Sequence, residues 1–492
     1  MSILGNTKIQ ILILASFTLR LLYSILANPG TTEISFLYNH PYGDENSFNT
    51  IYTLLNFIGL DNTYLQLRLP LLIIFSISLY LFYKIVLTMF NAKTAYSATL
   101  ILHTFPIIFY TGCIASSHCL FLFFALLIWF FVKKYDHSKF FHCDFICGLF
   151  FLPAFINDSF AFFLIIPTML TIYLGNSDAK EKVMRIFSLT IGFAISLTLA
   201  YTFGFAIDFS HHLFHNFQSV NPHNFIIKIL YQVSPWMIFL STFCIIIMVF
   251  SFLQRNHDPK RNQLIEVFSW STIFSCLLFI KMNSETQVTA SLLIILPCIA
   301  ILIAYCIHYQ SNYFSKSVFS LTVIAVIFSI GFYFVSWSSV RHGVLPSKLT
   351  QMNHSQVQKE ILRQANDFIQ ENSGIKSFAN TLKEGLQDTQ FIFTDDTDLS
   401  LLLSFYLGRQ VYGFYVNNST LTHNGKFLSQ DGLYITENSI KGLKYGLSMY
   451  FKKVRFVKEI SITKSDKVFK RFFIYKCSHL KFPFNYELKP QS

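Results

Sequence analysis

Apolar residues along positions 1–337 gather into blocks of about twenty, the length that a helix needs to cross a hydrocarbon core of roughly 30 Å. Short polar stretches separate the blocks. Eleven such blocks occur, at 9–27, 69–90, 96–115, 117–132, 141–156, 159–175, 186–207, 233–253, 264–281, 287–308 and 317–337. This pattern predicts an α-helical polytopic membrane protein with about 11 transmembrane helices.

The basic residues between the blocks predict the orientation. With the N-terminus in the cytoplasm, thirteen Lys and Arg residues flank the inner ends of the spans and only three flank the outer ends: Arg68, Lys228 and Lys281. Cytoplasmic loops are enriched in Lys and Arg in this way. The pattern therefore predicts a multi-pass protein of the plasma (inner) membrane with a cytoplasmic N-terminus. The region after the last span would lie outside, in the periplasm of a Gram-negative cell.

The long apolar blocks stop after Trp337, and the charge density rises. Residues 356–371 have a helical pattern, another helix is expected from near Leu399 to Gly408, and runs typical of strands lie at 390–394, 411–416, 455–462 and 470–476. The sequence thus predicts a transmembrane domain over 1–337 and an extracytoplasmic small α/β domain over 341–492.

Composition supports a membrane protein and argues against nucleic acid as a partner. The chain is 53% hydrophobic and 13% charged, whereas soluble domains average about 25% charged residues. Of the formal net charge of +12, residues 341–492 carry +8, from 21 basic and 13 acidic residues. Beside a membrane, such an excess suits anionic lipid head groups or phosphorylated glycolipids. A solvated basic surface explains it equally well.

Cysteine and histidine residues give little sign of a metal site. Cys477 is the only one of nine cysteines in the 341–492 region, so it has no internal disulfide partner there. Cys143 and Cys147 lie one helical turn apart, without a nearby pair of histidines, and are interpreted as packing residues. Four histidines in the second external loop, 208–234, are interspersed with Phe and favour an interfacial helix over a metal site. No cofactor is certain from the sequence, although a divalent cation is possible.

The first external loop, 27–66, carries the candidate chemistry. It is long and polar and has no Lys or Arg, but it contains acidic residues and a histidine: Glu33, His40, Asp44, Glu45 and Asp61. A carboxylate at the bilayer surface could act as general base on an acceptor hydroxyl. The electrophile available there is a sugar on a polyprenyl phosphate, and Arg68 could stabilise the departing phosphate. The alternative is a solvated loop beside an arginine that snorkels to the head groups.

Several short motifs resemble one family. They are the R-L-P entry to the second span at Arg68-Leu69-Pro70, the hairpin-like stretch 148–174, the Ser234-Pro235-Trp236 end of the second loop, and DLSLLLSFYLGRQVY at 398–412. Together they resemble the C-type superfamily of integral membrane glycosyltransferases, of the bacterial protein mannosyltransferase and aminoarabinose-transferase type (dolichyl-phosphate-mannose-protein mannosyltransferases). The resemblance implies the same membrane fold, a polyprenyl-phosphate-sugar donor and an outer domain.

The resemblance also implies roles for individual residues. The family has an Asp-Glu pair in its first external loop, and Asp44-Glu45 in HPYGDENSF is the only such pair in this loop, so Asp44 is the preferred base. The His40-Pro41 element stands before this pair, whereas some members place it after. Glu33 therefore remains an alternative counterpart. His40 and Arg68 are assigned to the binding of the substrate.

Two positions depart from the family. The acidic residue expected between the third and fourth spans falls on Ser116-Ser117-His118. His118 could replace it as a hydrogen-bonding partner or could simply cap a span. The lysine expected in the following hairpin falls near Asn157-Asp158, where Asp158 would repel a phosphate. These departures leave a catalytically inactive relative as the alternative.

The leading hypothesis is an enzyme, a hexosyl or pentosyl transferase dependent on polyprenyl-phosphate sugars. It would glycosylate a lipid, glycan or protein outside the cytoplasm, for instance in modifying lipid A or a cell-envelope glycan. The alternative is an inactive relative that binds glycolipids or acts as a scaffold. A carrier is disfavoured, because only Arg20 lies deep in an apolar block and ion relays need several intramembrane charges.

Overall fold

The computed structural model describes the helices of the membrane region and a sheet near the C-terminus. The described residues are 3–26, 64–113, 117–135, 141–157, 159–175, 177–202, 229, 233–254, 260–280, 285–309, 312–342, 375, 378–383, 391–394, 399, 403, 406–407, 411–413, 432–436, 447, 451–464 and 467–480. They fall into two compact units, one holding every helix up to α17 and the other holding every described residue from Ile375 onward.

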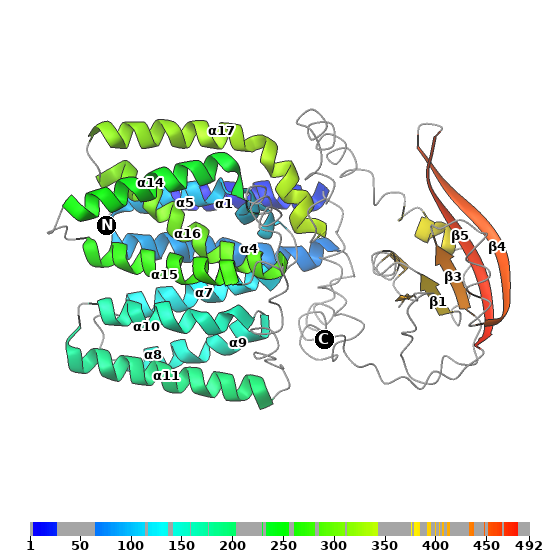
Figure 1. Cartoon of the computed structure of the whole chain (residues 1–492), viewed down its shortest axis with the longest axis horizontal. Coiled ribbons are helices and arrows are strands. Elements are labelled where there is room, and N and C mark those ends of the chain that lie inside the picture. Colours follow the sequence, from blue (N-terminus) through cyan, green and yellow to red (C-terminus); the bar gives the residue numbers. More distant parts are fainter. Residues whose placement is uncertain are drawn as a thin grey trace. The chain divides into compact units, whose positions relative to one another are not determined.

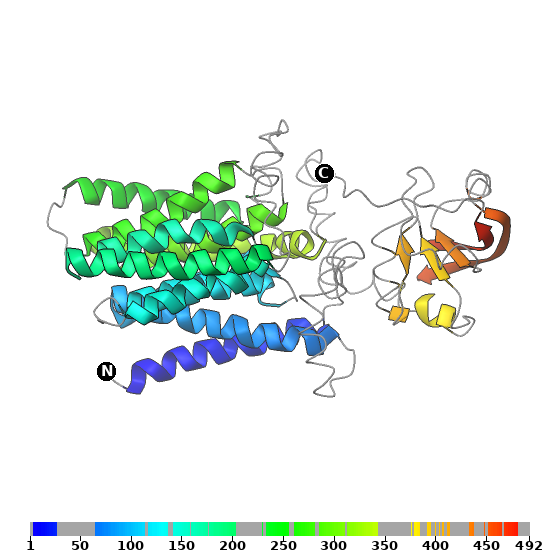
Figure 2. The ribbon, with the colours of Figure 1, turned by 90° about the horizontal axis from the view of Figure 1, so that it is seen from below.

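The first unit is a bundle of helices that lie side by side (Figures 1 and 2). In chain order these are α1 (Ile3–Leu26), α4 (Tyr64–Met89), α5 (Ala92–His103), α6 (Pro106–Thr111), α7 (Ser117–Lys134), α8 (Phe141–Leu149), α9 (Phe151–Asn157), the 3-10 helix η1 (Ser159–Leu164), α10 (Ile165–Leu174), α11 (Ala179–Thr202), α14 (Pro235–Gln254), α15 (Arg261–Ile280), α16 (Glu285–Tyr309) and α17 (Asn312–His342). Each overlaps a block predicted from the sequence, whereas the number of membrane crossings stays a prediction.

Several of the described helices have the length or the apolar surface of membrane spans. Three segments are long and apolar enough to cross a bilayer by length and composition: Arg68–Met89, Ala179–Thr202 and Ser291–Tyr309. Large apolar side chains point outward on several helices, such as Leu14 of α1, Phe187 of α11 and Phe328 of α17. Exposed apolar surface of this extent indicates contact with a nonaqueous partner, and lipid is the one that suits the length of these helices.

Helix α16 lies at the centre of the bundle. In its most apolar stretch of 18 residues, 83% of the residues are buried, against 56% in the corresponding stretch of α4 and 28% in that of α11. It packs against α5, α7, α14, α15 and α17. Pro297 interrupts its hydrogen-bond ladder without ending it, as neighbouring helices allow in membrane proteins.

Hydrogen bonds define two ends of the bundle. At one end, which we call the Glu266 end, Lys133 of α7 contacts Glu266 of α15, and Lys260 donates to the carbonyl of Met89. At the other, which we call the Arg68 end, Arg68 of α4 donates to the carbonyl of Ser24 in α1. The chain passes from the first end to the second through α5 and α6, which are separated at Thr104 and Phe105, just before Pro106. Proline disfavours a helical residue before it, which accounts for this break.

Helices α8 and α11 pack closely through two glycines. A Cβ at Gly148 would lie 2.6 Å from the carbonyl oxygen of Leu189 and 2.7 Å from the backbone nitrogen of Phe193. Gly192 faces Gly148 from the other helix, and the Ser196 hydroxyl donates to the Gly148 carbonyl at 2.9 Å. Small residues at such contacts let the backbones of membrane helices approach.

We therefore expect Gly148→Ala to destabilise the protein by about 1–3 kcal/mol, because the new methyl group meets backbone atoms and the two helices must separate. The thermal unfolding midpoint in detergent micelles would measure this. Thr190→Ala, an exposed change on the outer side of α11, is the matched control and should alter stability by less than about 0.5 kcal/mol. Equal midpoints for the two variants would contradict the close packing.

The second unit contains a five-stranded mixed sheet of order β2-β1-β3-β5-β4. Its strands are β1 (Phe391–Thr394), β2 (Tyr412–Gly413), β3 (Gly432–Thr436), β4 (Phe451–Lys464) and β5 (Lys467–Leu480). Strands β1, β2 and β3 are parallel, whereas β5 is antiparallel to both β3 and β4. Each of the four strand-like runs of the sequence overlaps a strand, namely β1, β2, β4 or β5. The helix expected over 356–371 lies outside the described residues.

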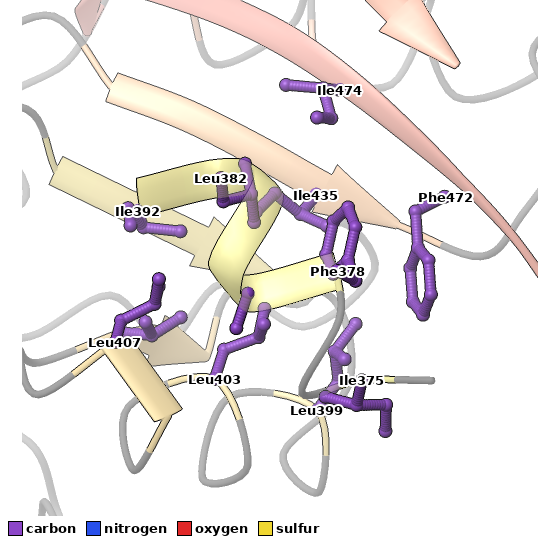
Figure 3. Close-up of a cluster of buried hydrophobic side chains, with 12 residues drawn as sticks. Ile375, Phe378, Leu382, Ile392, Leu399, Leu403, Leu407, Ile435, Phe472 and Ile474 are labelled. Atoms are coloured by element: carbon purple, nitrogen blue, oxygen red, sulfur yellow. The ribbon is translucent and has the colours of Figure 1, made fainter. Parts of the chain in front are cut away.

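Apolar clusters cover both faces of this sheet. On one face, Ile392, Ile435 and Ile474 pack against helical residues, including Phe378 and Leu403 (Figure 3). The rings of Phe378 and Phe472 stack there at 4.2 Å between centroids. On the other face, Tyr434, Tyr475 and Cys477 belong to a second cluster. Burial raises the pKa of the Cys477 thiol to about 12, so this free cysteine stays protonated at neutral pH.

Candidate functional site

The candidate site lies at the Arg68 end, where α1 ends and α4 and α7 begin. Arg68 stands in the second turn of α4, two residues before Pro70, and its side chain is only 2% exposed. Its Nη1 atom donates to the carbonyl oxygen of Ser24 at 2.6 Å. A guanidinium is charged at every physiological pH and can donate several hydrogen bonds to phosphate oxygens, which suits the binding of a phosphate.

Ser24 connects three elements at this end. Its carbonyl accepts from Arg68, and its hydroxyl donates to the carbonyl of Cys113, just after α6, at 2.8 Å. The side chain of Ser24 is fully buried. Ser24 thereby fixes both the arginine of α4 and the point from which the chain continues towards α7.

His118 begins the neighbouring helix. The next residue, Cys119, donates through its thiol to the carbonyl of Leu71 at 3.4 Å, which places the start of α7 one turn from Arg68. His118 is half-buried, and its Nδ1 atom is buried with no hydrogen-bond partner among the described residues. A buried ring nitrogen in this state is rare in proteins and indicates a site for a further polar group.

A second arginine lies one helical turn further down α1. Arg20 is 1% exposed, donates through Nε to the carbonyl of Phe109 at 3.3 Å and hydrogen-bonds the hydroxyl of Ser16. Its guanidinium carbon lies 4.7 Å from the ring centroid of Phe75 and 4.9 Å from that of Phe109. Contacts of this kind stabilise a buried cation.

Gly112 makes room for this arrangement. A Cβ there would lie 2.6 Å from a ring carbon of Phe75 and 2.8 Å from the Nε atom of Arg20. Arg20 and Arg68 thus place two buried guanidinium groups among α1, α4 and α6, near the predicted start of the first external loop.

The structure places only part of the predicted site. Arg68 and His118 lie together on neighbouring helices at one end of the bundle. Asp44, Glu45, Glu33, His40 and Asp158 lie outside the described residues, so their roles stay predictions. The described residues contain no group of three or more His, Cys, Asp or Glu side chains that could hold a metal ion; the possible divalent cation is untested.

Sequence reasoning missed two features at this end. Ser24 gave no signal because its role depends on contacts with residues 44 and 89 positions away. Ser234, at the start of α14, has a φ of 82°, which is costly for a residue with a side chain, and its hydroxyl lies 2.6 Å from that of Ser329 in α17. The Ser-Pro-Trp motif of the sequence marked this position but gave no sign of the positive φ at Ser234.

The helices and the sheet of this chain share their fold with a protein of known structure. The crystal structure of ArnT from Cupriavidus metallidurans in the apo state matches it with a TM-score of 0.53, 12% identity and coverage of 96% of this chain and 98% of that one. The same protein bound to undecaprenyl phosphate matches with a TM-score of 0.51, 11% identity, and coverage of 94% and 97%.

The family model described as dolichyl-phosphate-mannose-protein mannosyltransferase matches residues 49–205. This segment includes Arg68 and His118. No curated protein sequence matches the chain. The resemblance drawn from the sequence is thus confirmed, by a family match over this segment and by a shared fold along almost the whole chain.

Proposed function

We propose that the protein is a glycosyltransferase that moves a sugar from a polyprenyl-phosphate donor to a lipid, glycan or protein acceptor on the outer face of the membrane. The observation that carries this proposal is the buried Arg68 at the entry of α4, held by the Ser24 carbonyl within the segment that matches the mannosyltransferase family model. The structure of ArnT with undecaprenyl phosphate, which shares this fold, supports the donor class.

The proposed reaction is a direct displacement at the anomeric carbon. Asp44, by preference, accepts the proton of the acceptor hydroxyl as the oxygen attacks. The bond from the anomeric carbon to the phosphate oxygen breaks, and Arg68 stabilises the negative charge of the departing polyprenyl phosphate. His118 hydrogen-bonds the donor or the acceptor through the ring nitrogen that lacks a described partner. The expected compartment is the inner membrane, with the second unit in the periplasm.

The test is turnover by the purified full chain with radiolabelled undecaprenyl-phosphate sugars. Asp44→Asn should reduce the release of undecaprenyl phosphate by about 100- to 10,000-fold, the range that general-base catalysis contributes, while donor binding is kept. Asp61→Asn, in the same loop but without a proposed role, is the control and should be close to wild type.

Glu33→Gln decides between the two candidate bases. If Asp44→Asn is fully active and Glu33→Gln is inactive, Glu33 is the base and the Asp-Glu pair is not. Full activity in both variants would eliminate Asp44 and Glu33 and leave Glu45 as the remaining candidate in this loop. These results leave the assignment of the family unaffected.

A second candidate function is that of an inactive relative that binds glycolipids. Two sequence observations favour it: His118 stands where the family has an acidic residue, and Asp158 stands near the position of its lysine. Donor binding by wild type without any release of undecaprenyl phosphate, across the common sugars, would select this alternative.

A further inference from the structure

The positive charge of the second unit is concentrated on the β4–β5 hairpin. Residues 451–480 contain nine Lys and Arg residues against two acidic ones, Glu459 and Asp466. This net charge of +7 accounts for nearly all of the +8 carried by residues 341–492. The excess noted in the sequence is therefore a property of one structural element.

The pairing register brings four of these cations to one face. Lys453 pairs with Ser478, Arg455 with Lys476, and Lys458 with Ile474. Alternate residues of a strand share a face, so Ile474, Lys476 and Ser478 lie together, and their partners lie beside them. We call Lys453, Arg455, Lys458 and Lys476 the cationic face; all four side chains are exposed, whereas Ile474 on the same side of the sheet is buried in the first apolar cluster.

A bulge completes this face. The register shifts between Phe456 and Lys458, so Val457 is an additional residue in β4. Without it, Lys458 would point to the opposite side of the hairpin, because a shift of one residue exchanges the two faces of a strand. Val457 itself is 48% exposed and adds an apolar group on β4 between Arg455 and Lys458.

The arrangement costs stability. Arg455 stands directly opposite Lys476, and like charges in this position destabilise a sheet. Strands at the edge of a sheet often carry lysines that prevent pairing with other chains, and β4 is the edge strand of the described sheet. Edge protection accounts for cations on β4, and Lys476 adds a fourth cation to the same face from β5, an inner strand of the described sheet.

We propose that the cationic face binds the anionic phosphate head groups of a lipid bilayer. Its charge is complementary to that surface, and basic groups near an anionic membrane are attracted to it. Residues 343–374 connect this unit to a helical unit with membrane-spanning helices, so the bilayer is present at high effective concentration. The proposal concerns a docking surface and does not depend on the proposed transfer reaction.

The test uses the full chain in nanodiscs of phosphatidylcholine, mixed with vesicles and separated by flotation. We expect the wild type to bind vesicles in which about a third of the lipid is phosphatidylglycerol, to ignore pure phosphatidylcholine vesicles, and to be released at about 1 M salt, where charges are screened within about 3 Å. Equal binding to both kinds of vesicle, or binding to neither, would overturn the proposal.

Two triple variants with the same loss of charge locate the surface. Lys453→Gln, Arg455→Gln and Lys458→Gln together should weaken binding to anionic vesicles on the order of 100-fold, since each basic residue near the surface contributes severalfold. This variant should also be at least as stable as wild type, because the repulsion between Arg455 and Lys476 is gone.

The control changes exposed basic residues that lie outside the cationic face: Lys383→Gln, Lys452→Gln and Arg471→Gln. It should bind much more tightly than the first variant. Equal losses in both would show that overall charge, rather than this face, attracts the lipid. Soluble polyglutamate serves as a competitor. If it displaces the protein from the anionic vesicles as well as added unlabelled anionic vesicles do, the face binds acidic polypeptides and the lipid assignment is wrong.

Discussion

Replacement of Arg68 by methionine is expected to slow the release of undecaprenyl phosphate by about 100- to 1,000-fold, the effect of removing one preorganised stabiliser of developing charge. The side chain is 2% exposed and is fixed by the Ser24 carbonyl, so no other conformation or water molecule replaces it at low cost. The rate of release at saturating donor and the donor affinity, measured separately, are the readouts.

Two further variants separate charge from structure. Arg68→Lys keeps a positive charge but loses the planar guanidinium, and its rate should fall between those of wild type and Arg68→Met. Ser24→Ala keeps the carbonyl that binds Arg68 and loses only the hydroxyl bond to Cys113, worth about 1 kcal/mol of stability. Wild-type release by a folded Arg68→Met protein would remove Arg68 from the reaction and leave the similarity of fold unaffected.

The helices of the first unit could be predicted well because their signal is local. About twenty consecutive apolar residues are enough to indicate a span, whatever lies next to it. Interruptions inside a span were harder to see. The block 96–115 is divided into α5 and α6 before Pro106, and the block 141–156 into α8 and α9 at Phe150. The apolar composition continues through both breaks, so periodicity alone does not reveal them.

The strands of the sheet are marked most clearly in the sequence where one side of the strand is exposed. The alternation of apolar and polar residues marked β4 and β5, which are exposed on at least part of their length. Strand β3 was missed because four of its five residues, in GLYIT, are buried. A short strand that is covered on both faces loses the period of two on which recognition depends.

Buried charges in the helices were also underestimated. The sequence indicated only Arg20 deep in an apolar block, and Arg20 is indeed buried. Near the Glu266 end, however, Glu266 accepts from Trp129 at 2.7 Å and from Lys133 at 2.6 Å, and Asp144 pairs with Arg185. Partners 41 to 137 positions apart cannot be matched from spacing in a single sequence.

The ion pair of Asp144 and Arg185 gives the largest expected effect on stability. Arg185 Nε donates to Asp144 Oδ2 at 2.9 Å, and Nη2 donates to Oδ1 at 3.1 Å and to the carbonyl of Val132 at 3.1 Å. The pair thus connects α11 with α8 and α7. Both side chains are at most 3% exposed. Arg185→Met should cost about 3–5 kcal/mol, because it leaves a buried carboxylate without its cation, and should lower the thermal unfolding midpoint in detergent micelles accordingly.

The double variant Asp144→Leu with Arg185→Met tests the physical reason. Replacing both members of a buried ion pair by apolar residues is often neutral or stabilising, so most of the loss should be recovered, apart from the cost of the Val132 carbonyl that has lost a donor. Lys180→Met, an exposed change on the same helix, controls for the loss of a positive charge near this end and should be close to neutral. If the double variant is as unstable as Arg185→Met, the arginine stabilises the protein through its bond to Val132 and its packing, and the isolated carboxylate is not the cause.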